Sequence, residues 1–231
     1  LKVVAQRQVP EDEIQLAIEN AEDEMLANGI VAVGDICNTI HSFSQKAKRR
    51  MAYYNFIEVS GWLPQVATQR FLKSKEFYDL FSTLSPHYTA MAPHAPYSVS
   101  DDLWEMLSPY FANNTTTIHN QETIFEDELF LHGRGDLLQM YEKMNMNNSF
   151  FRPTNKTSLQ SYLQKLCTAK HIILVHNTFT TEEDILFTKI NSKKTYISWC
   201  LCVNASQYIE GTFPPIELMR KHHCSIVIGT D

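Results

Sequence analysis

The chain alternates between short apolar runs and longer segments in which apolar residues recur at helical spacing. Pro10 opens the first such segment, with an acidic turn and apolar positions three and four residues apart as far as Leu26. Segments of the same kind lie near residues 44–51, 66–81, 101–111, 123–144, 158–169, 180–190 and 215–222. Short runs rich in apolar and β-branched residues predict strands at residues 30–33, 55–59, 88–91, 115–118, 172–175, 195–199 and 225–228. We expect Gly34 and Asp35 to close the first strand, and residues 145–154 to form a loop.

Strands that alternate with helices predict βα units and a parallel sheet. An open doubly wound sheet and a (β/α)8 TIM-like barrel both fit this order. A barrel needs eight strands and typically about 250 residues, so seven predicted strands in 231 residues indicate a barrel that lacks one strand. No linker or composition shift divides the chain, and residues 1–231 are expected to form a single α/β domain.

The composition is that of a globular protein, with 44% apolar and 20% charged residues. The net charge of −6 argues against a nucleic-acid surface, and the single basic run at residues 48–50 is interpreted as a solvated helix end. Apolar runs are far shorter than the roughly 20 residues that a membrane-spanning helix needs. Because the chain begins without Met, its true start is expected to lie upstream.

The five cysteines are odd in number and irregularly spaced, so no disulfide framework is expected. We expect reduced, buried thiols and a cytoplasmic protein. Cys200 and Cys202 are closely spaced, but no second pair completes a tetrahedral metal site.

Polar residues gather where the predicted strands end. The C-terminal ends of barrel strands form one rim, and active sites lie on that rim. A single histidine on an apolar segment is ordinarily a satisfied core residue, but a set in register favours a functional site. The strand ends carry Glu58, His94, His119, His176 and Asp231.

These residue types point to metal chemistry. Imidazole and carboxylate are good ligands for Zn²⁺ and similar ions, and a bound ion lowers the pKa of its water towards about 7. A glutamate that does not bind the metal can shuttle protons between that water and a substrate. Glu122, three residues after His119, suits this role, and a solvated position in the first turn of a helix is an equally good interpretation.

The remaining histidines lack this strand-end context. His222 and His223 precede the last strand on the stability face of a barrel and are excluded as ligands. Solvated or structural roles are favoured for His41, His87, His132 and His171.

Four segments together resemble the amidohydrolase superfamily, in its aminohydrolase branch. They are residues 92–100 (APHAPYSVS), His119-x-x-Glu122, residues 175–177 (VHN) and residues 229–231 (GTD), in the order found in that family. Residues 198–204 resemble a further motif, usually Cys-Pro-x-Ser-Asn, with Leu201 and Val203 replacing its proline and serine. This branch includes S-adenosylhomocysteine/methylthioadenosine deaminases, guanine deaminases and chlorohydrolase-like proteins.

The resemblance implies a role for each matching residue. His119 and Asp231 would bind one divalent metal ion, zinc or iron, and Asp231 would help to activate the water. Glu122 would shuttle protons, and His176 would contact the water or the leaving group, or bind metal in dinuclear relatives. His94 would lie in the substrate pocket, whereas Glu58 receives no role.

The sequence departs from the family at one point. The family's first strand ends in His-x-His, which supplies two metal ligands, and this motif does not occur here. The resemblance therefore makes the seven strands numbers two to eight. The family's small β-sandwich domain is likewise expected to lie outside this chain.

We therefore expect a metal-dependent hydrolase of non-peptide carbon–nitrogen bonds that deaminates a nucleobase, a nucleoside or a related ring. The alternatives are a cyclic amidohydrolase or chlorohydrolase on the same fold, and a non-catalytic barrel remnant that acts as a binding protein. The expected partner is a small-molecule substrate, and binding to nucleic acid or to a membrane is not expected. The sequence does not decide whether the chain forms a homodimer.

Overall fold

The computed structural model describes residues 9–231, and it contains the seven strands that the sequence predicts, with shifted ends. All strand pairs are parallel, and helices separate the strands along the chain. The prediction of an α/β fold with parallel strands is therefore confirmed. The strands are β1 (Ala32–Cys37), β2 (Ala52–Val59), β3 (Thr89–Pro93), β4 (Thr115–Asn120), β5 (His171–His176), β6 (Tyr196–Leu201) and β7 (Ser225–Ile228).

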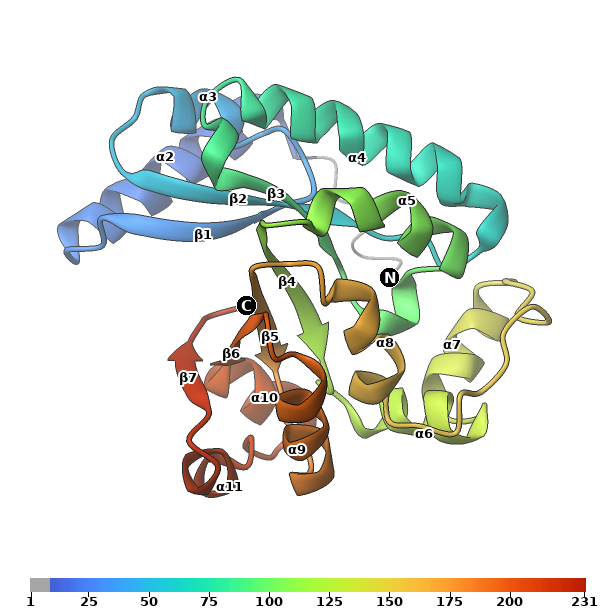
Figure 1. The fold of residues 1–231 in the computed structure, drawn as a ribbon. Helices are drawn as coiled ribbons and strands as arrows, with labels where there is room; N and C mark the ends of the chain where they lie inside the picture. The colour runs from blue at the N-terminus through green and yellow to red at the C-terminus, as the bar shows by residue number, and fades with distance from the viewer. Residues whose placement is uncertain (1–8) are drawn as a thin grey trace.

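The helices connect the strands and cover the outer face of the sheets (Figure 1). The prediction missed helix α10, whose only buried side chain is Ser206, so its sequence shows little helical periodicity. The α-helices are α2 (Glu11–Ala27), α3 (Phe43–Ala47), α4 (Ala67–Ser82), α5 (Asp101–Phe111), α6 (Ile124–His132), α7 (Asp136–Lys143), α8 (Ser158–Leu166), α9 (Glu182–Asn191), α10 (Val203–Glu210) and α11 (Ile216–Lys221). Short 3₁₀ turns lie at η1 (Pro64–Val66), η2 (Pro86–Tyr88) and η3 (Pro96–Ser98).

The first strand corrects the sequence prediction. It was expected at residues 30–33 and closed by Gly34 and Asp35, but β1 runs through both residues. Gly34 is accommodated because it lies against the ring of Phe56, 3.2 Å from where a Cβ would stand. The Asp35 carboxylate is accommodated because it pairs with the buried Lys46 ammonium at 2.5 Å.

The strands form two sheets, β1-β2-β3 and β4-β5-β6-β7, which meet at β3 and β4 (Figure 1). Two bonds cross this junction: the His119 N–H donates to the His94 carbonyl, and the Thr116 hydroxyl donates to the Met91 carbonyl, both at 2.9 Å. The strands thus follow barrel order, but residues 9–231 do not close a barrel.

The larger of two hydrophobic clusters fixes helices to the strands. In α5 the buried residues Leu103, Leu107 and Phe111 are spaced four apart, so they lie on one face and pack against the sheet. Ser100 caps this helix by accepting the Leu103 N–H, so the helix begins at Asp101 as predicted. The same core includes strand residues such as Ile57 on β2, Ile118 on β4 and Leu174 on β5, so it holds both sheets against the helices.

No helix within residues 9–231 is both long enough and apolar enough to cross a lipid bilayer.

Candidate active site

A cavity of about 700 Å³ lies between the two sheets and is lined by residues from all seven strands. Its polar lining includes Glu58, His94, His119 and Asp231. The structure therefore brings four of the predicted strand-end residues to one space.

His119 and His176 meet because the two strands present them differently. Thr117, His119, Ile173 and Val175 line the cavity, as alternation along β4 and β5 requires. By the same alternation His176 would point away with Leu174. Its φ of +75° breaks the alternation and turns its ring back towards His119.

The two imidazoles and the Asp231 carboxylate form a compact group. His119 Nδ1 lies 2.7 Å from His176 Nε2, and the rings stack with centroids 4.9 Å apart. Asp231 Oδ1 is 3.4 Å from His176 Nε2 and 3.9 Å from His119 Nδ1. All three ligand atoms lie within 4.8 Å of one another, so they could share one metal ion. Two imidazoles and a carboxylate are a donor set that zinc accepts.

The chemistry of the donor atoms supports this interpretation. His176 is fully buried, and its Nε2 faces both His119 Nδ1 and Asp231 Oδ1. Imidazole nitrogens and a carboxylate oxygen that converge in this way are suitable ligands for a divalent ion. The residues present therefore fit a bound cation.

The surroundings of His119 keep its imidazole neutral. Burial lowers the pKa of His119 to about 3, and the neighbouring His94 and His176 rings act in the same direction. His119 is thus an unprotonated ligand at neutral pH. A hydrogen bond with His176 holds the pKa of Asp231 below its usual range against the effect of burial, so this carboxylate is ionised.

Glu122 reaches the same group from the segment that follows β4. Its Oε1 lies 3.7 Å from His176 Nε2. Burial raises the pKa of Glu122 above its ordinary value, although the charges of His176 and His94 oppose this. A carboxyl group with a raised pKa holds its proton more readily than an ordinary glutamate, which suits an acid–base residue. Glu122 precedes α6 and its side chain is 18% exposed, so it lies beside His176 rather than in a solvated helical turn.

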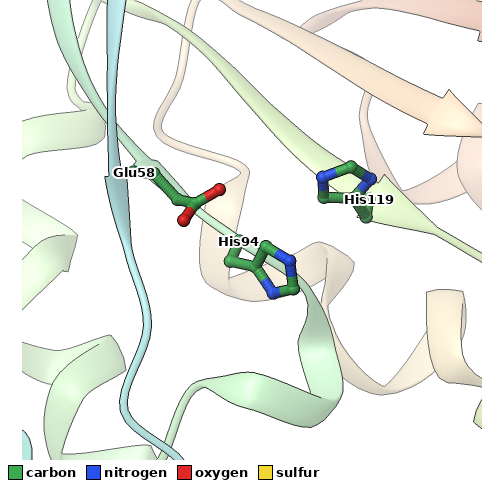
Figure 2. A group of neighbouring side chains, drawn as sticks. All are labelled: Glu58, His94 and His119. Atoms are coloured by element: carbon green, nitrogen blue, oxygen red, sulfur yellow. The ribbon is translucent and has the colours of Figure 1, made fainter. Parts of the chain in front are cut away.

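Glu58, His94 and His119 form a second group of possible ligands (Figure 2). Their ligand atoms also lie within 4.8 Å of one another, and Figure 2 shows the three side chains pointing towards a common space. Ser98 Oγ holds His94 Nδ1 at 2.8 Å, which leaves the other ring nitrogen free to face the cavity. The family resemblance assigns no role to Glu58, and the signal for it in the sequence is its place near the end of a predicted strand.

The other histidines lie elsewhere. His41 pairs with Glu11 at 3.1 Å, His171 contacts Ser198 at 2.9 Å, and His222 contacts Glu182 at 2.6 Å. The remaining three, His87, His132 and His223, are exposed. None of the six lines the cavity.

The cysteines match the expectation in part. All five thiols are free; Cys37 and Cys202 are buried as expected, whereas Cys167, Cys200 and Cys224 are half-buried. Cys200 and Cys202 border the cavity. They flank Gly229, whose hydrogen leaves room for both sulfur atoms.

Comparison with known proteins gives fold-level similarity only. No family model matches the chain, and no curated protein matches it. Several solved structures do match the chain. Aminofutalosine deaminase from Helicobacter pylori superimposes with a TM-score of 0.79 at 21% identity, covering 94% of this chain and 54% of that chain. A zinc-bound adenosine deaminase from Xanthomonas campestris gives 0.62 at 19% identity, covering 97% and 47%.

A mutant atrazine chlorohydrolase from Arthrobacter aurescens, complexed with zinc and atraton, gives a TM-score of 0.62 at 12% identity, covering 96% of this chain and 49% of that chain. The chain therefore shares its fold with these deaminases and this chlorohydrolase. Within that fold the chain is similar to both deaminases and chlorohydrolases. It spans about half the length of the solved structures that it matches.

Proposed function

We propose that this chain carries the catalytic site of a metal-dependent hydrolase that removes an amino group from a nitrogen-containing ring. The observation that carries the proposal is Glu122 beside the His119–His176–Asp231 group. The structural neighbours support the reaction class, because two of them are a deaminase of aminofutalosine and a deaminase of adenosine. The substrate class is a nucleobase, a nucleoside or a related ring.

His119, His176 and Asp231 would hold one divalent ion, zinc or iron. Zinc is supported by the zinc-bound adenosine deaminase among the neighbours. When bound, such an ion supplies an ionised water at neutral pH by lowering its pKa towards about 7. In this interpretation the seven strands correspond to strands two to eight of a barrel domain.

The residues of the chain supply positioning and proton transfer. The ionised Asp231 carboxylate accepts a hydrogen bond from the attacking water and orients it towards the ring carbon. Glu122 takes the proton that the water loses and returns it to the amino group, which leaves as ammonia while oxygen takes its place on the ring. His94 contacts the ring, since Ser98 fixes its orientation.

Small-molecule binding is supported by a second structure of one of these neighbours. The Helicobacter pylori aminofutalosine deaminase is also known in complex with methylthio-coformycin. The cavity of about 700 Å³ is within the range of small-molecule sites.

The test is Glu122→Gln in the intact protein, assayed for ammonia release from amino-substituted purines, pyrimidines and triazines. We expect kcat to fall by about 10²–10⁴-fold, the usual size of an acid–base contribution, with unchanged metal content. Glu105→Gln, on the exposed face of α5, is the matched control and should retain full activity. Ammonia release that survives Glu122→Gln would remove Glu122 from the mechanism.

The same assay separates the alternatives. A chlorohydrolase, which one neighbour's activity favours, releases chloride from a chlorinated ring and no ammonia. A cyclic amidohydrolase opens its ring without releasing either product. A binding protein turns over none of these compounds and holds no stoichiometric metal.

A further inference from the structure

Glu126, in the first turn of α6, is a buried acid with an unusual set of partners. Its Oε1 accepts the backbone N–H of Glu122 at 2.9 Å, and its Oε2 accepts the N–H of Gln121 at 3.1 Å. The Ser158 hydroxyl, from α8, donates to Oε2 at 2.8 Å. The side chain of Glu126 has no exposed surface. A carboxylate buried at this depth is costly unless its hydrogen bonds hold it in place.

These bonds differ from an ordinary helix cap. Thr123 is the N-cap of α6 and Glu126 is the third helical residue, the spacing of a capping box. In a capping box the glutamate would accept the N–H of Thr123. Here it reaches past Thr123 and accepts the two preceding N–H groups, those of Gln121 and Glu122. The carboxylate therefore fixes the segment that joins β4 to α6.

The backbone of that segment adopts an unfavourable conformation. Gln121 has a φ of +46°, in the left-handed region that costs a non-glycine residue about 1–2 kcal/mol. Without Glu126, two successive buried N–H groups would lose their acceptors, and the next residue along, Glu122, would lose its fixed position.

We propose that Glu126 is a positioning residue, which holds the main chain of Glu122 so that its carboxyl group stays next to His176. The Ser158 hydroxyl, at the start of α8, ties Glu126 to that helix. The inference rests on the proposed role of Glu122 in proton transfer.

Asp127 provides a matched control. It is the next residue on α6 and is similarly buried. It accepts the Ser158 N–H at 2.7 Å and lies 3.2 Å from Gln121 Nε2, but it touches no main-chain atom of residues 121–122. Asp127→Asn therefore perturbs the same polar cluster without releasing Glu122.

The experiment compares Glu126→Gln with Asp127→Asn in the intact protein at pH 8. An amide at position 126 can accept only one of the two N–H groups. We expect hydrogen exchange at the Gln121 and Glu122 amides, followed by NMR, to accelerate at least tenfold in Glu126→Gln and to stay unchanged in Asp127→Asn. We expect kcat for ammonia release to fall about 10–100-fold in Glu126→Gln with KM within threefold, and to stay within threefold in Asp127→Asn.

Unchanged exchange and unchanged kcat in Glu126→Gln would overturn the inference, and so would equal losses of kcat in the two variants. Faster exchange with full activity in both Glu126→Gln and Glu122→Gln would support the main-chain clamp and overturn the proposed function instead. If Glu126→Gln does not fold, Ser158→Ala takes its place, since it removes one of the three donors to the carboxylate. In that variant at least a threefold loss of kcat is expected, and no loss would overturn the inference.

Discussion

At the scale of single residues, the candidate site depends on one backbone exception. Alternation along β4 delivers His119 to the cavity, but alternation along β5 would send His176 the other way. The left-handed φ of His176 reverses that direction and brings its ring within 2.7 Å of His119. A side chain that breaks the strand period at this point is held there by its surroundings, which is typical of functional residues.

Gly229 is a second residue on which the site depends, and it gives a prediction about stability. A Cβ at this position would stand 2.7 Å from Cys200 Sγ and 3.4 Å from Cys202 Sγ, too close for the nearer sulfur. We expect Gly229→Ala to lower the free energy of unfolding by about 1–3 kcal/mol, the usual cost of overpacking. Urea denaturation of the purified variants measures this.

The control is the same change in a Cys200→Ala background, where the near sulfur is absent. There we expect less than half of the cost to remain, because the two positions are in contact and their effects are coupled. An equal cost in both backgrounds would show that the close approach to Cys200 is not the cause.

At the scale of elements, the sequence predicts most of the fold because the strands are buried and the helices carry clear signals. The strand at 225–228 and the helix at 101–111 match the structure residue for residue, the helix because Ser100 caps it and acidic residues follow. The β1 boundary was wrong because a glycine and an aspartate normally end a strand. The partner that makes Asp35 tolerable, Lys46, is distant in sequence and becomes a partner only in three dimensions.

Helix α6 carries a prediction about pH. Burial raises the pKa of Glu126 from 4.5 to about 7, although its hydrogen bonds oppose the shift. A raised pKa means that the folded state binds this proton more tightly than the unfolded state. The resulting stability is fully present below pH 4.5 and is lost as the pH rises through 7.

At about 1.4 kcal/mol per pKa unit, the loss from this group amounts to about 3 kcal/mol. Glu126→Gln has no carboxyl group at this position and escapes this loss. As the pH rises from 4.5 to 8, we therefore expect the difference in unfolding free energy between the variant and wild type to shift by up to about 3 kcal/mol in favour of the variant. Urea denaturation at both pH values, with wild type measured alongside, provides the comparison. A relative stability that stays constant over this range would mean that Glu126 titrates at its ordinary pKa.

At the scale of the whole molecule, the candidate metal group connects parts of the chain that are far apart in sequence. His119 lies on β4, His176 on β5 and Asp231 beyond β7. The strand-end pattern predicted this convergence, because parallel strands bring their C-terminal ends to one rim. The pattern could not predict Glu126, whose capping-box spacing indicates a different hydrogen bond from the one it makes. It also could not pair Glu58 with His94, since that contact depends on how the strands meet around the cavity.

A metal ion bound by residues from three separate segments of the chain should stabilise the folded state as a whole. With free Zn²⁺ at about 100 times its dissociation constant, the unfolding free energy should rise by about 2.7 kcal/mol, less any binding to the unfolded chain. Chemical denaturation with and without zinc measures the rise, and a chelator should reverse it. Asp231→Asn removes one ligand oxygen and should abolish most of the effect at the same zinc concentration. An equal rise in Asp231→Asn would place the zinc elsewhere.

The junction between the two sheets has a consequence for how such a protein can change over evolutionary time. At the cavity, β3 and β4 are joined by the main-chain bond from the His119 N–H to the His94 carbonyl. A main-chain bond does not depend on side-chain identity, so mutations at rim positions such as Glu58 or His94 can alter the cavity wall without moving the frame around it. A lineage built this way can exchange one substrate for another through a few substitutions. The structural neighbours share this fold at 12–21% identity, yet they act on compounds as different as aminofutalosine and atrazine. Such a range of substrates on one fold is consistent with a frame that tolerates changes in its cavity wall.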